Sequence, residues 1–361
     1  MGCKQSLRAN SVTWVDAVIQ DAEKYRTFLS AKVAALQAHL KDPQIPFASL
    51  DHFKVISYLG AGSFSSVLEV QHKDNSTRYA IKIIRKDQIT TQPGLAEQVL
   101  NEKNVHAALD FEFIIKLYFA FKDNTCLYFV LEFATCGNLY DLLKRRRLNE
   151  DEARFYVAQL ILALEYIHAA DIIYRDLKPD NVLVNYDGYL KLADFGLARR
   201  LDEKKKAYSL CGTAEYIAPE VATTDGYRGY GLGADWWSLG ILVHFLVFRK
   251  TPFVACSPAE TINAVIQNKF RIRKIAKLSK KIETFLYEIL EKQPEDRLGV
   301  KGKGVLSLKN HSWLRGYEWM TLYKKRVIPP EPNPQPQWVR NIDWKPEFSS
   351  KILYEKEFEH F

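Results

Sequence analysis

Residues 173–184 of the chain read IYRDLKPDNVLV. Five charged or amide side chains stand in this stretch between two short apolar runs, which are typical of buried strands. Polar groups next to a core need hydrogen-bond partners or a functional role, because burying them unpaired costs free energy. The stretch therefore predicts a turn that presents reactive side chains and is fixed by core strands on both sides.

The composition is that of an ordinary globular protein with ample material for a core. Of 361 residues, 47% are hydrophobic and 26% are charged, so one large domain or two lobes with extensions is expected. The net charge of +8 is spread along the chain, and the runs at 144–147 and 204–206 are typical of solvated faces. We therefore expect no nucleic-acid partner.

Cysteine usage and hydropathy narrow the class further. The five cysteines form no CxxC pair, which predicts a reducing compartment without a disulfide framework or a zinc site. No secretory signal peptide is recognisable. The apolar run from Leu239 to Phe248 contains His244 and is too short to span a bilayer, so it predicts a buried helix. A cytoplasmic protein is expected.

Hydrophobic periodicity divides the chain into a strand-rich half and a helical half. An amphipathic helix is predicted over 11–40, strands over 53–84 around a glycine-rich turn, a helix over 94–109 and strands over 113–134. Helices are predicted over 138–145, 150–169, 234–248, 258–267 and 280–291, and a proline-rich segment over 329–336.

Two features of the strand-rich half suit a phosphate-containing ligand. The turn LGAGSFSSV (59–67) has small residues that let backbone N–H groups approach phosphate oxygens, although a simple glycine hairpin explains it equally well. Lys82 stands inside an apolar strand, where it needs a partner unless it lies at an edge. Glu102 on the following helix is the candidate partner.

The opening stretch can then be interpreted as a catalytic loop. Asp176 can accept or orient a hydroxyl proton, Lys178 can neutralise a phosphoryl group in transfer, and Asn181 offers a neutral oxygen to a metal. Asp194, in the sequence LADFG, can hold Mg²⁺ that bridges phosphates. Each group alone could belong to a structural turn, but their shared order and spacing favour phosphoryl transfer.

Taken together, the glycine-rich turn, AIK (80–82), YRDLKPDN (174–181), DFG (194–196) and APE (218–220) resemble a eukaryotic protein kinase over residues 53–313. The segments 210–220 and 235–240, with the flanking helix and tail, resemble the AGC family and within it the catalytic subunits of cAMP-dependent kinases. The resemblance implies an α+β, two-lobed fold. Its small β-rich lobe covers 53–134 and its helical lobe 135–313, between an N-terminal segment 1–50 and a tail 314–361.

The resemblance also implies the cofactors ATP and Mg²⁺ and a role for each site residue. Asp176, Lys178 and Asn181 would be catalytic, and Asn181 and Asp194 would bind the metal. The implied nucleotide-binding residues are Leu59, Gly60, Ala61, Gly62, Ser63, Phe64, Ser65, Ser66, Val67, Ala80, Lys82, Glu102, Leu131, Glu132, Ala134 and Leu183. Glu220 would pair with Arg297, and Asp235 would brace the catalytic loop.

Ser209 matches the family's phosphorylation position, with a plain loop serine as the alternative. Arg175 and Arg199 would hold the phosphate. Two departures weaken the match: the segment from Asp194 to Ser209 is longer by two residues, and Gln98 stands where the cAMP-dependent enzyme has a histidine.

Further departures concern substrates and partners. Asn138 and Phe245 occupy positions where the cAMP-dependent enzyme has glutamates for substrate arginines. Asp180 keeps one acid nearby, but no strong demand for arginine is expected. Ser65 replaces the third glycine of the turn. Tyr208 replaces a tryptophan that docks the cAMP-binding regulatory subunit, which is nonetheless retained as a candidate partner beside protein substrates.

Both chain ends carry their own signals. Residues 1–6, MGCKQS, fit N-myristoylation at Gly2, with Cys3 as a palmitoylation site, and predict a membrane-associated fraction unless the acyl chain folds onto the large lobe. At the other end, Phe358 and Phe361 are predicted to pack on the small lobe, and Trp344 near the adenine. The alternatives to an active kinase of this type are a nucleotide-binding scaffold and a kinase outside cAMP control.

Overall fold

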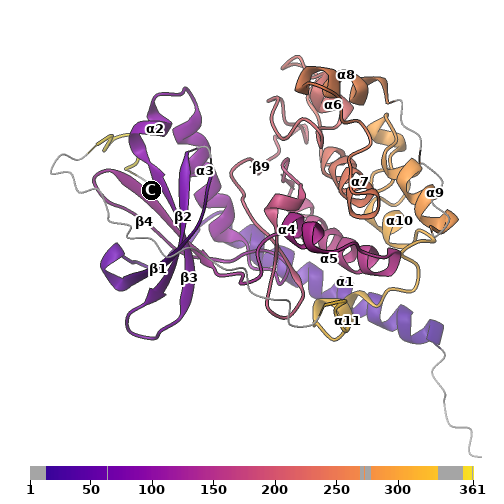
Figure 1. The fold of residues 1–361 in the computed structure, drawn as a ribbon, viewed down its shortest axis with the longest axis horizontal. Helices are drawn as coiled ribbons and strands as arrows, with labels where there is room; N and C mark the ends of the chain where they lie inside the picture. Colours follow the sequence, from indigo (N-terminus) through magenta and orange to yellow (C-terminus); the bar gives the residue numbers. More distant parts are fainter. Residues whose placement is uncertain (1–13, 63, 269–271, 273–277, 332–352, 360) are drawn as a thin grey trace, which may run out of the picture.

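The structure is a computed structural model that describes residues 14–62, 64–268, 272, 278–331, 353–359 and 361. Figure 1 shows a small lobe built on a sheet and a larger helical lobe beside it. This arrangement confirms the predicted α+β, two-lobed fold.

Five antiparallel strands form the sheet of the small lobe, in the order β1-β2-β3-β5-β4. They are β1 (Phe53–Ala61), β2 (Ser65–His72), β3 (Arg78–Arg85), β4 (Leu117–Lys122) and β5 (Cys126–Glu132). Lys82 lies in the central strand, where its register partners are Val67 on β2 and Phe129 on β5. The glycine-rich turn joins β1 to β2, so it borders the strand that carries Lys82.

Successive side chains of a strand point to opposite faces of the sheet. The central strands carry apolar side chains on both faces, and both faces are covered. One face packs Val70, Ile81 and Tyr128 into a cluster of their own. On the other face, Leu127 and Phe129 pack against α2 (Lys86–Thr90) and α3 (Leu95–Ala108). The helix α3 is thereby held against the strand that carries Lys82.

The last described residues return to the face that α3 covers. Phe358 is fully buried there, and the ring of Phe361 lies 5.3 Å from the ring of Phe129. Lys86 Nζ donates a hydrogen bond of 3.2 Å to the carbonyl of Leu353. The predicted packing of the two terminal phenylalanines on the small lobe is confirmed, whereas Trp344 lies outside the described residues.

The large lobe is a set of helices around two buried ones, α5 (Glu150–His168) and α7 (Gly233–Phe248). A capping box of Asn149 and Glu152 begins α5. The other helices are α4 (Leu139–Arg145), α6 (Pro219–Ala222), α8 (Pro258–Gln267), α9 (Lys280–Ile289), α10 (Val305–Lys309) and α11 (Trp319–Tyr323). The five helices predicted for this lobe are therefore confirmed, with bounds shifted by at most two residues.

Short strands enclose the opening stretch of sequence, as predicted. It begins in β6 (Ile172–Ile173), which pairs with β9 (Arg199–Arg200), and ends in β7 (Val182–Val184), which pairs with β8 (Leu190–Leu192). Between them lies one turn of 3₁₀ helix, Pro179–Asn181. Both flanking strands are largely buried, so the polar turn is fixed at each end.

The N-terminal helix α1 (Trp14–His39) lies beside α11 of the large lobe (Figure 1) and is held there by polar contacts. Asp21 accepts backbone N–H bonds from Met320 (2.7 Å) and Thr321 (3.0 Å) at the start of α11. Tyr25 donates to the buried Glu165 at 3.1 Å. Farther along the helix, Lys32 Nζ lies 2.7 Å from Asp110 Oδ2, just after α3, so α1 extends the large lobe and also reaches the small one.

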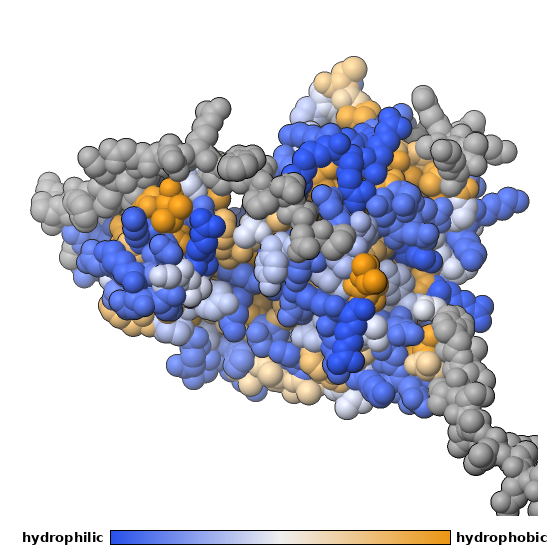
Figure 2. All heavy atoms as spheres, turned by 60° about the horizontal axis from the view of Figure 1, so that its bottom comes forward, coloured by the Kyte–Doolittle hydropathy of each residue, from blue (hydrophilic) through white to orange (hydrophobic). Residues whose placement is uncertain are grey.

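None of the helices in the described part of the chain is long and apolar enough to cross a bilayer. On the face drawn in Figure 2, the described surface is mainly hydrophilic and its hydrophobic areas are small and separate.

Candidate active site

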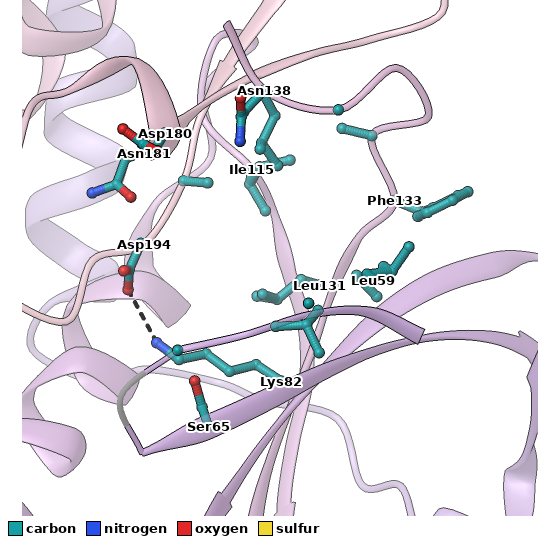
Figure 3. Close-up of a pocket in the computed structure, with 18 of the residues that line it drawn as sticks. Leu59, Ser65, Lys82, Ile115, Leu131, Phe133, Asn138, Asp180, Asn181 and Asp194 are labelled. Atoms are coloured by element: carbon teal, nitrogen blue, oxygen red, sulfur yellow. Dashed lines mark hydrogen bonds and ion pairs between the residues drawn. The ribbon is translucent and has the colours of Figure 1, made fainter. Parts of the chain in front are cut away.

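A cavity of about 940 Å³ lies between the sheet and the large lobe, and Figure 3 shows part of its lining. The structure brings most of the predicted site residues to it. The predicted nucleotide-binding residues in its lining are Leu59, Gly60, Ala61, Gly62, Ser65, Val67, Ala80, Lys82, Glu102, Leu131, Glu132, Ala134 and Leu183. The lining also contains Asp176, Lys178, Asn181 and Asp194.

Two residues predicted for the nucleotide do not line this cavity. Ser66 is flanked on β2 by Ser65 and Val67, which do line it, so strand alternation turns Ser66 to the other face. Phe64 packs instead against the apolar cluster that contains Phe358. Ser63 lies outside the described residues.

The two glycines of the turn differ in what they require. The N–H of Gly62 donates to the carbonyl of Ser65 at 2.8 Å and closes the turn. A Cβ at Gly62 would stand 2.8 Å from Ser65 Oγ, whereas one at Gly60 would meet nothing within 4 Å. A side chain at Gly62 would therefore require the Ser65 hydroxyl to rotate away, while Gly60 leaves open space above the cavity.

Lys82 joins the two lobes through a pair of carboxylates. Its Nζ lies 2.7 Å from Glu102 Oε1 on α3. It also lies 3.0 Å from Asp194 Oδ1 in the large lobe, the contact drawn as a dashed line in Figure 3. Burial acts to lower the pKa of Lys82, but the two carboxylates outweigh it and hold this pKa above its usual value. The charge of Lys82 in turn lowers the pKa of Asp194, whereas burial raises the pKa of Glu102.

Asp235 on α7 holds the predicted catalytic loop from below. Its carboxylate, which has no exposed surface, accepts backbone N–H bonds of 2.8 Å from Tyr174 and Arg175 and lies 2.7 Å from His168 Nε2. Arg175 has a φ of 71°, a backbone conformation that non-glycine residues rarely adopt. These bonds hold it there, and the predicted bracing role of Asp235 is confirmed.

Asp176 is held by three donors at the surface of the cavity. Lys178 Nζ (2.8 Å) and Asn181 Nδ2 (2.8 Å) reach its Oδ2, and the Thr213 hydroxyl donates to its Oδ1 at 2.9 Å. Lys178 Nζ also donates to Thr213 Oγ1 at 3.0 Å. Thr213 lies in the segment 210–220, but no signal in the sequence predicted this contact. The carboxylate therefore has a fixed orientation.

Two oxygen donors, from Asn181 and Asp194, face the cavity where the metal was predicted. The amide nitrogen of Asn181 is occupied by Asp176, which leaves its oxygen for another ligand. Asp194 has a φ of 55° and a carboxylate that is about half exposed. Within the described ranges no three His, Cys, Asp or Glu side chains gather as a metal cluster. One carboxylate plus one amide oxygen is the modest set that suits Mg²⁺ bound jointly with phosphates.

Ser209 lies next to one of its two predicted arginines. Arg175 Nη1 donates to Ser209 Oγ at 2.8 Å, and the Tyr230 hydroxyl donates to the Ser209 carbonyl at 2.6 Å. Arg199 is exposed on β9, and the contacts of the described residues place no hydrogen bond between it and Ser209. Phosphorylation of Ser209 stays a prediction.

Gln98, which stands at the histidine position of the cAMP-dependent enzyme, bonds to the backbone of the segment after Asp194. Its Nε2 donates to the carbonyl of Gly196 at 2.8 Å, and Asn101 Nδ2 donates to the carbonyl of Ala198 at 2.7 Å. The helix α3 is thus tied to the segment after Asp194 by neutral amides.

Glu220 and Arg297 form the predicted structural ion pair. Arg297 is fully buried, and its Nη1 and Nη2 lie 2.6 and 2.9 Å from the two oxygens of Glu220. Because this bidentate arginine–carboxylate pair is buried, it fixes the segment that leads from Ser209 into α6.

A buried histidine in the lining of the cavity was also missed by the sequence reasoning. His106 on α3 places Nε2 2.7 Å from the carbonyl of Ile115, and its ring lies 4.9 Å from Phe195, next to Asp194. Burial lowers the pKa of His106 to about 4, so it is neutral at physiological pH. Its place on α3, one helical turn after Glu102, was the signal in the sequence that could have identified it.

Comparison with known proteins gives a match to the protein kinase domain family over residues 53–314. Among similar curated proteins is the serine/threonine-protein kinase AtPK1/AtPK6 of Arabidopsis thaliana, 36% identical over 281 residues, which are 78% of this chain and 59% of that protein. Human ribosomal protein S6 kinase alpha-3 is 33% identical over 328 residues, 90% of this chain and 43% of that protein. Mouse cGMP-dependent protein kinase 2 is 36% identical over 305 residues, 83% and 39% respectively. The chain thus spans about two- to three-fifths of the length of these relatives.

Proposed function

The chain belongs to the protein kinase family, and we propose that it is an AGC-type serine/threonine kinase that transfers the γ-phosphate of ATP to Ser or Thr of protein substrates. One observation carries the proposal: Lys82, paired with Glu102 and Asp194, faces the same cavity as the oriented carboxylate of Asp176. The cation suits phosphates, and Asp176 suits the attacking hydroxyl.

The residues of the cavity fit ATP in shape and chemistry. Leu59, Val67, Ala80, Leu131 and Leu183 provide an apolar slot for the adenine, and the backbone of Glu132 and Ala134 would read its edge. In this proposal Lys82 holds the α- and β-phosphates, and the open space above Gly60 lets the turn approach them.

Asn181 and Asp194 are proposed to hold Mg²⁺, which when bound neutralises the charge of the phosphates. The chain does the remaining work by positioning and electrostatics. Asp176 orients the substrate hydroxyl and accepts its proton, while Lys178 offers positive charge to the group in transfer. Thr213 keeps both in place, since it contacts each of them.

We expect Asp194→Asn to lower phosphotransfer by about 10²-fold or more, since one of two metal donors loses its charge. Chelation of Mg²⁺ with EDTA is expected to abolish the activity of the unmodified protein. Transfer of label from γ-labelled ATP to a Ser peptide, measured across a Mg²⁺ titration, checks both. Equal rates for the variant and the unmodified protein at low Mg²⁺ would remove Asp194 from the metal site.

Within the AGC type, we propose that the activity of this kinase is controlled by a cAMP-binding regulatory subunit. Support comes from the motifs at 210–220 and 235–240, from the docked helix α1 and from the buried Phe358. Tyr208 stands where that partner docks, and the relatives named above include a cGMP-dependent kinase instead. A kinase outside cAMP control is therefore the second candidate.

Capture of the chain on an immobilised regulatory subunit separates these two candidates. The proposal predicts capture without cAMP and release on its addition, because cAMP favours the form of the subunit that frees the kinase. Activity that is unaffected by the subunit in both conditions would favour the second candidate. A nucleotide-binding scaffold, the third reading, would bind ATP and transfer nothing.

Gly2 and Cys3 lie outside the described residues, and their acylation stays a proposal. A cytoplasmic enzyme is proposed from the cysteine usage, and its membrane-associated fraction is proposed on Gly2 and Cys3 alone.

A further inference from the structure

An exposed cationic surface lies at the C-terminal end of α4. It consists of Lys144, Arg145 and Arg147 together with Arg249 and Lys250 from the end of α7, and we refer to these five residues as the basic ledge. The two segments are joined directly, because Arg249 Nη1 donates to the carbonyl of Arg146 at 2.8 Å. All of the ledge residues except the half-buried Arg249 are exposed.

The structure separates one arginine of this run from the others. Arg146 is turned inward, where it pairs with Glu152 (2.8 Å) and with Glu331 (3.0 Å). Around Arg145, Arg147 and Lys250, by contrast, the described part of the chain places no carboxylate within 4 Å. Lys144 has only a loose contact of 3.4 Å with Asp141. Within the run 144–147, Arg146 is thus paired with carboxylates, whereas the positive charge of the other three residues is largely uncompensated.

The ledge is continuous with the candidate active site. Asn138, the N-cap of α4, lines the cavity, and Phe245 stacks on Tyr140 at 6.1 Å. Lys144 Nζ lies 4.4 Å from the centre of the Tyr140 ring. A helix of this length rises ~10 Å, which an extended peptide spans in about three residues. A substrate that lies along α4 therefore reaches the ledge several residues away from its phosphoacceptor.

We propose that the basic ledge binds acidic residues of protein substrates, several positions away from the Ser or Thr that is phosphorylated. The inference rests on the proposed kinase function. Exposed arginines pair with carboxylates through their planar forks, and several such pairs together add selectivity that one surface pair does not. The basic run at 144–147, which composition alone assigns to a solvated face, would thus bind acidic residues of a substrate.

A peptide fits this surface better than an anionic membrane does. Asp141 and Asp180 line the cavity at the near end of α4, so negative charge precedes the positive ledge. A peptide can match that change of sign along its length, with neutral or basic residues near the acceptor and acidic ones farther away. A uniformly anionic lipid surface would meet the two carboxylates as well as the ledge.

The test compares two peptides with one acceptor core, which differ only in a distal tract of three Glu or three Gln. With the unmodified protein, kcat/KM is expected to be about tenfold higher for the Glu peptide, through KM, and the gap is expected to close at high salt. Arg145→Ser/Arg147→Ser should abolish the gap and leave the Gln peptide unaffected. The matched control is Lys280→Ser/Lys281→Ser, two exposed cations at the start of α9, away from α4 (Figure 1).

Reversal of charge strengthens the test. Arg145→Glu/Arg147→Glu is expected to favour a distal Lys tract over the Glu tract. Phosphorylation of both peptides with equal KM by the unmodified protein would overturn the ledge proposal and leave the kinase proposal standing. Loss of phosphatidylserine vesicle binding by Arg145→Ser/Arg147→Ser, with an unchanged peptide preference, would overturn it in favour of a membrane. Phosphorylation of neither peptide nor of any protein would instead remove the kinase function on which the proposal rests.

Discussion

Replacement of Asp176 by alanine is expected to lower kcat for phosphotransfer by about 10³-fold while the protein stays folded and binds ATP. The carboxylate is the group in the cavity that three donors, Lys178, Asn181 and Thr213, hold in one orientation. Without it the attacking hydroxyl has no acceptor for its proton, and Lys178 loses its nearest negative partner. Steady-state kinetics with a Ser peptide measure the effect.

Two controls separate chemistry from structure in this experiment. Asp176→Asn keeps an oxygen acceptor for Thr213 but lacks the charge, so it should lose nearly as much activity as the alanine variant. Thr213→Ala keeps the carboxylate and removes one of its donors, so it should lose about tenfold. Turnover near that of the unmodified protein in Asp176→Ala would contradict the assignment of this residue.

Arg297→Met is expected to produce the largest loss of stability, about 3–5 kcal/mol. Arg297 is fully buried and has two bonds to Glu220, so its removal leaves a carboxylate without its counter-charge. The guanidinium also donates to the carbonyl of Gly233 at 2.8 Å, which ties α7 to the same site. Urea unfolding at neutral pH measures the change in the free energy of unfolding.

Lys301→Met is the matched control for the Arg297 experiment. Lys301 lies 3.1 Å from Glu288, but both side chains are more than a third exposed, so the loss should stay below about 1 kcal/mol. A loss of similar size in the two variants would mean that burial of the Glu220 pair has no special weight. Because Glu220 ends the segment that starts at Asp194, Arg297→Met should also reduce activity.

The fold was predictable because its elements have strong periodicity and sharp ends. The helix α5, for example, begins at the Asn149 capping box and is buried along its length, and its predicted range of 150–169 differs from the observed end by one residue. The pairing of Lys82 with Glu102 was also predictable, since a lysine inside a buried strand requires a nearby acid. Short polar motifs with fixed spacing also predicted that Asp176 and Asp194 belong to one site, and both line the same cavity.

Partners that depend on how loops meet could not be predicted. Nothing in the sequence around Thr213 indicates that its hydroxyl reaches Asp176, because the two residues come from separate loops. The bond from Gln98 to the carbonyl of Gly196 has the same origin. Phe64 was assigned to the nucleotide as part of its motif, but its apolar ring gains more by packing with Phe358 and its neighbours.

The most direct test of phosphoryl transfer is mass spectrometry of a Ser peptide incubated with Mg²⁺, ATP and the purified chain, with Lys82→Met as the control. The chain should be assayed both unphosphorylated and phosphorylated at Ser209. Phosphoserine and an equal amount of ADP are expected with the unmodified protein, and at least ~10²-fold less with Lys82→Met. Binding of ATP without any phosphoserine in either form would rule out phosphoryl transfer and favour a nucleotide-binding scaffold.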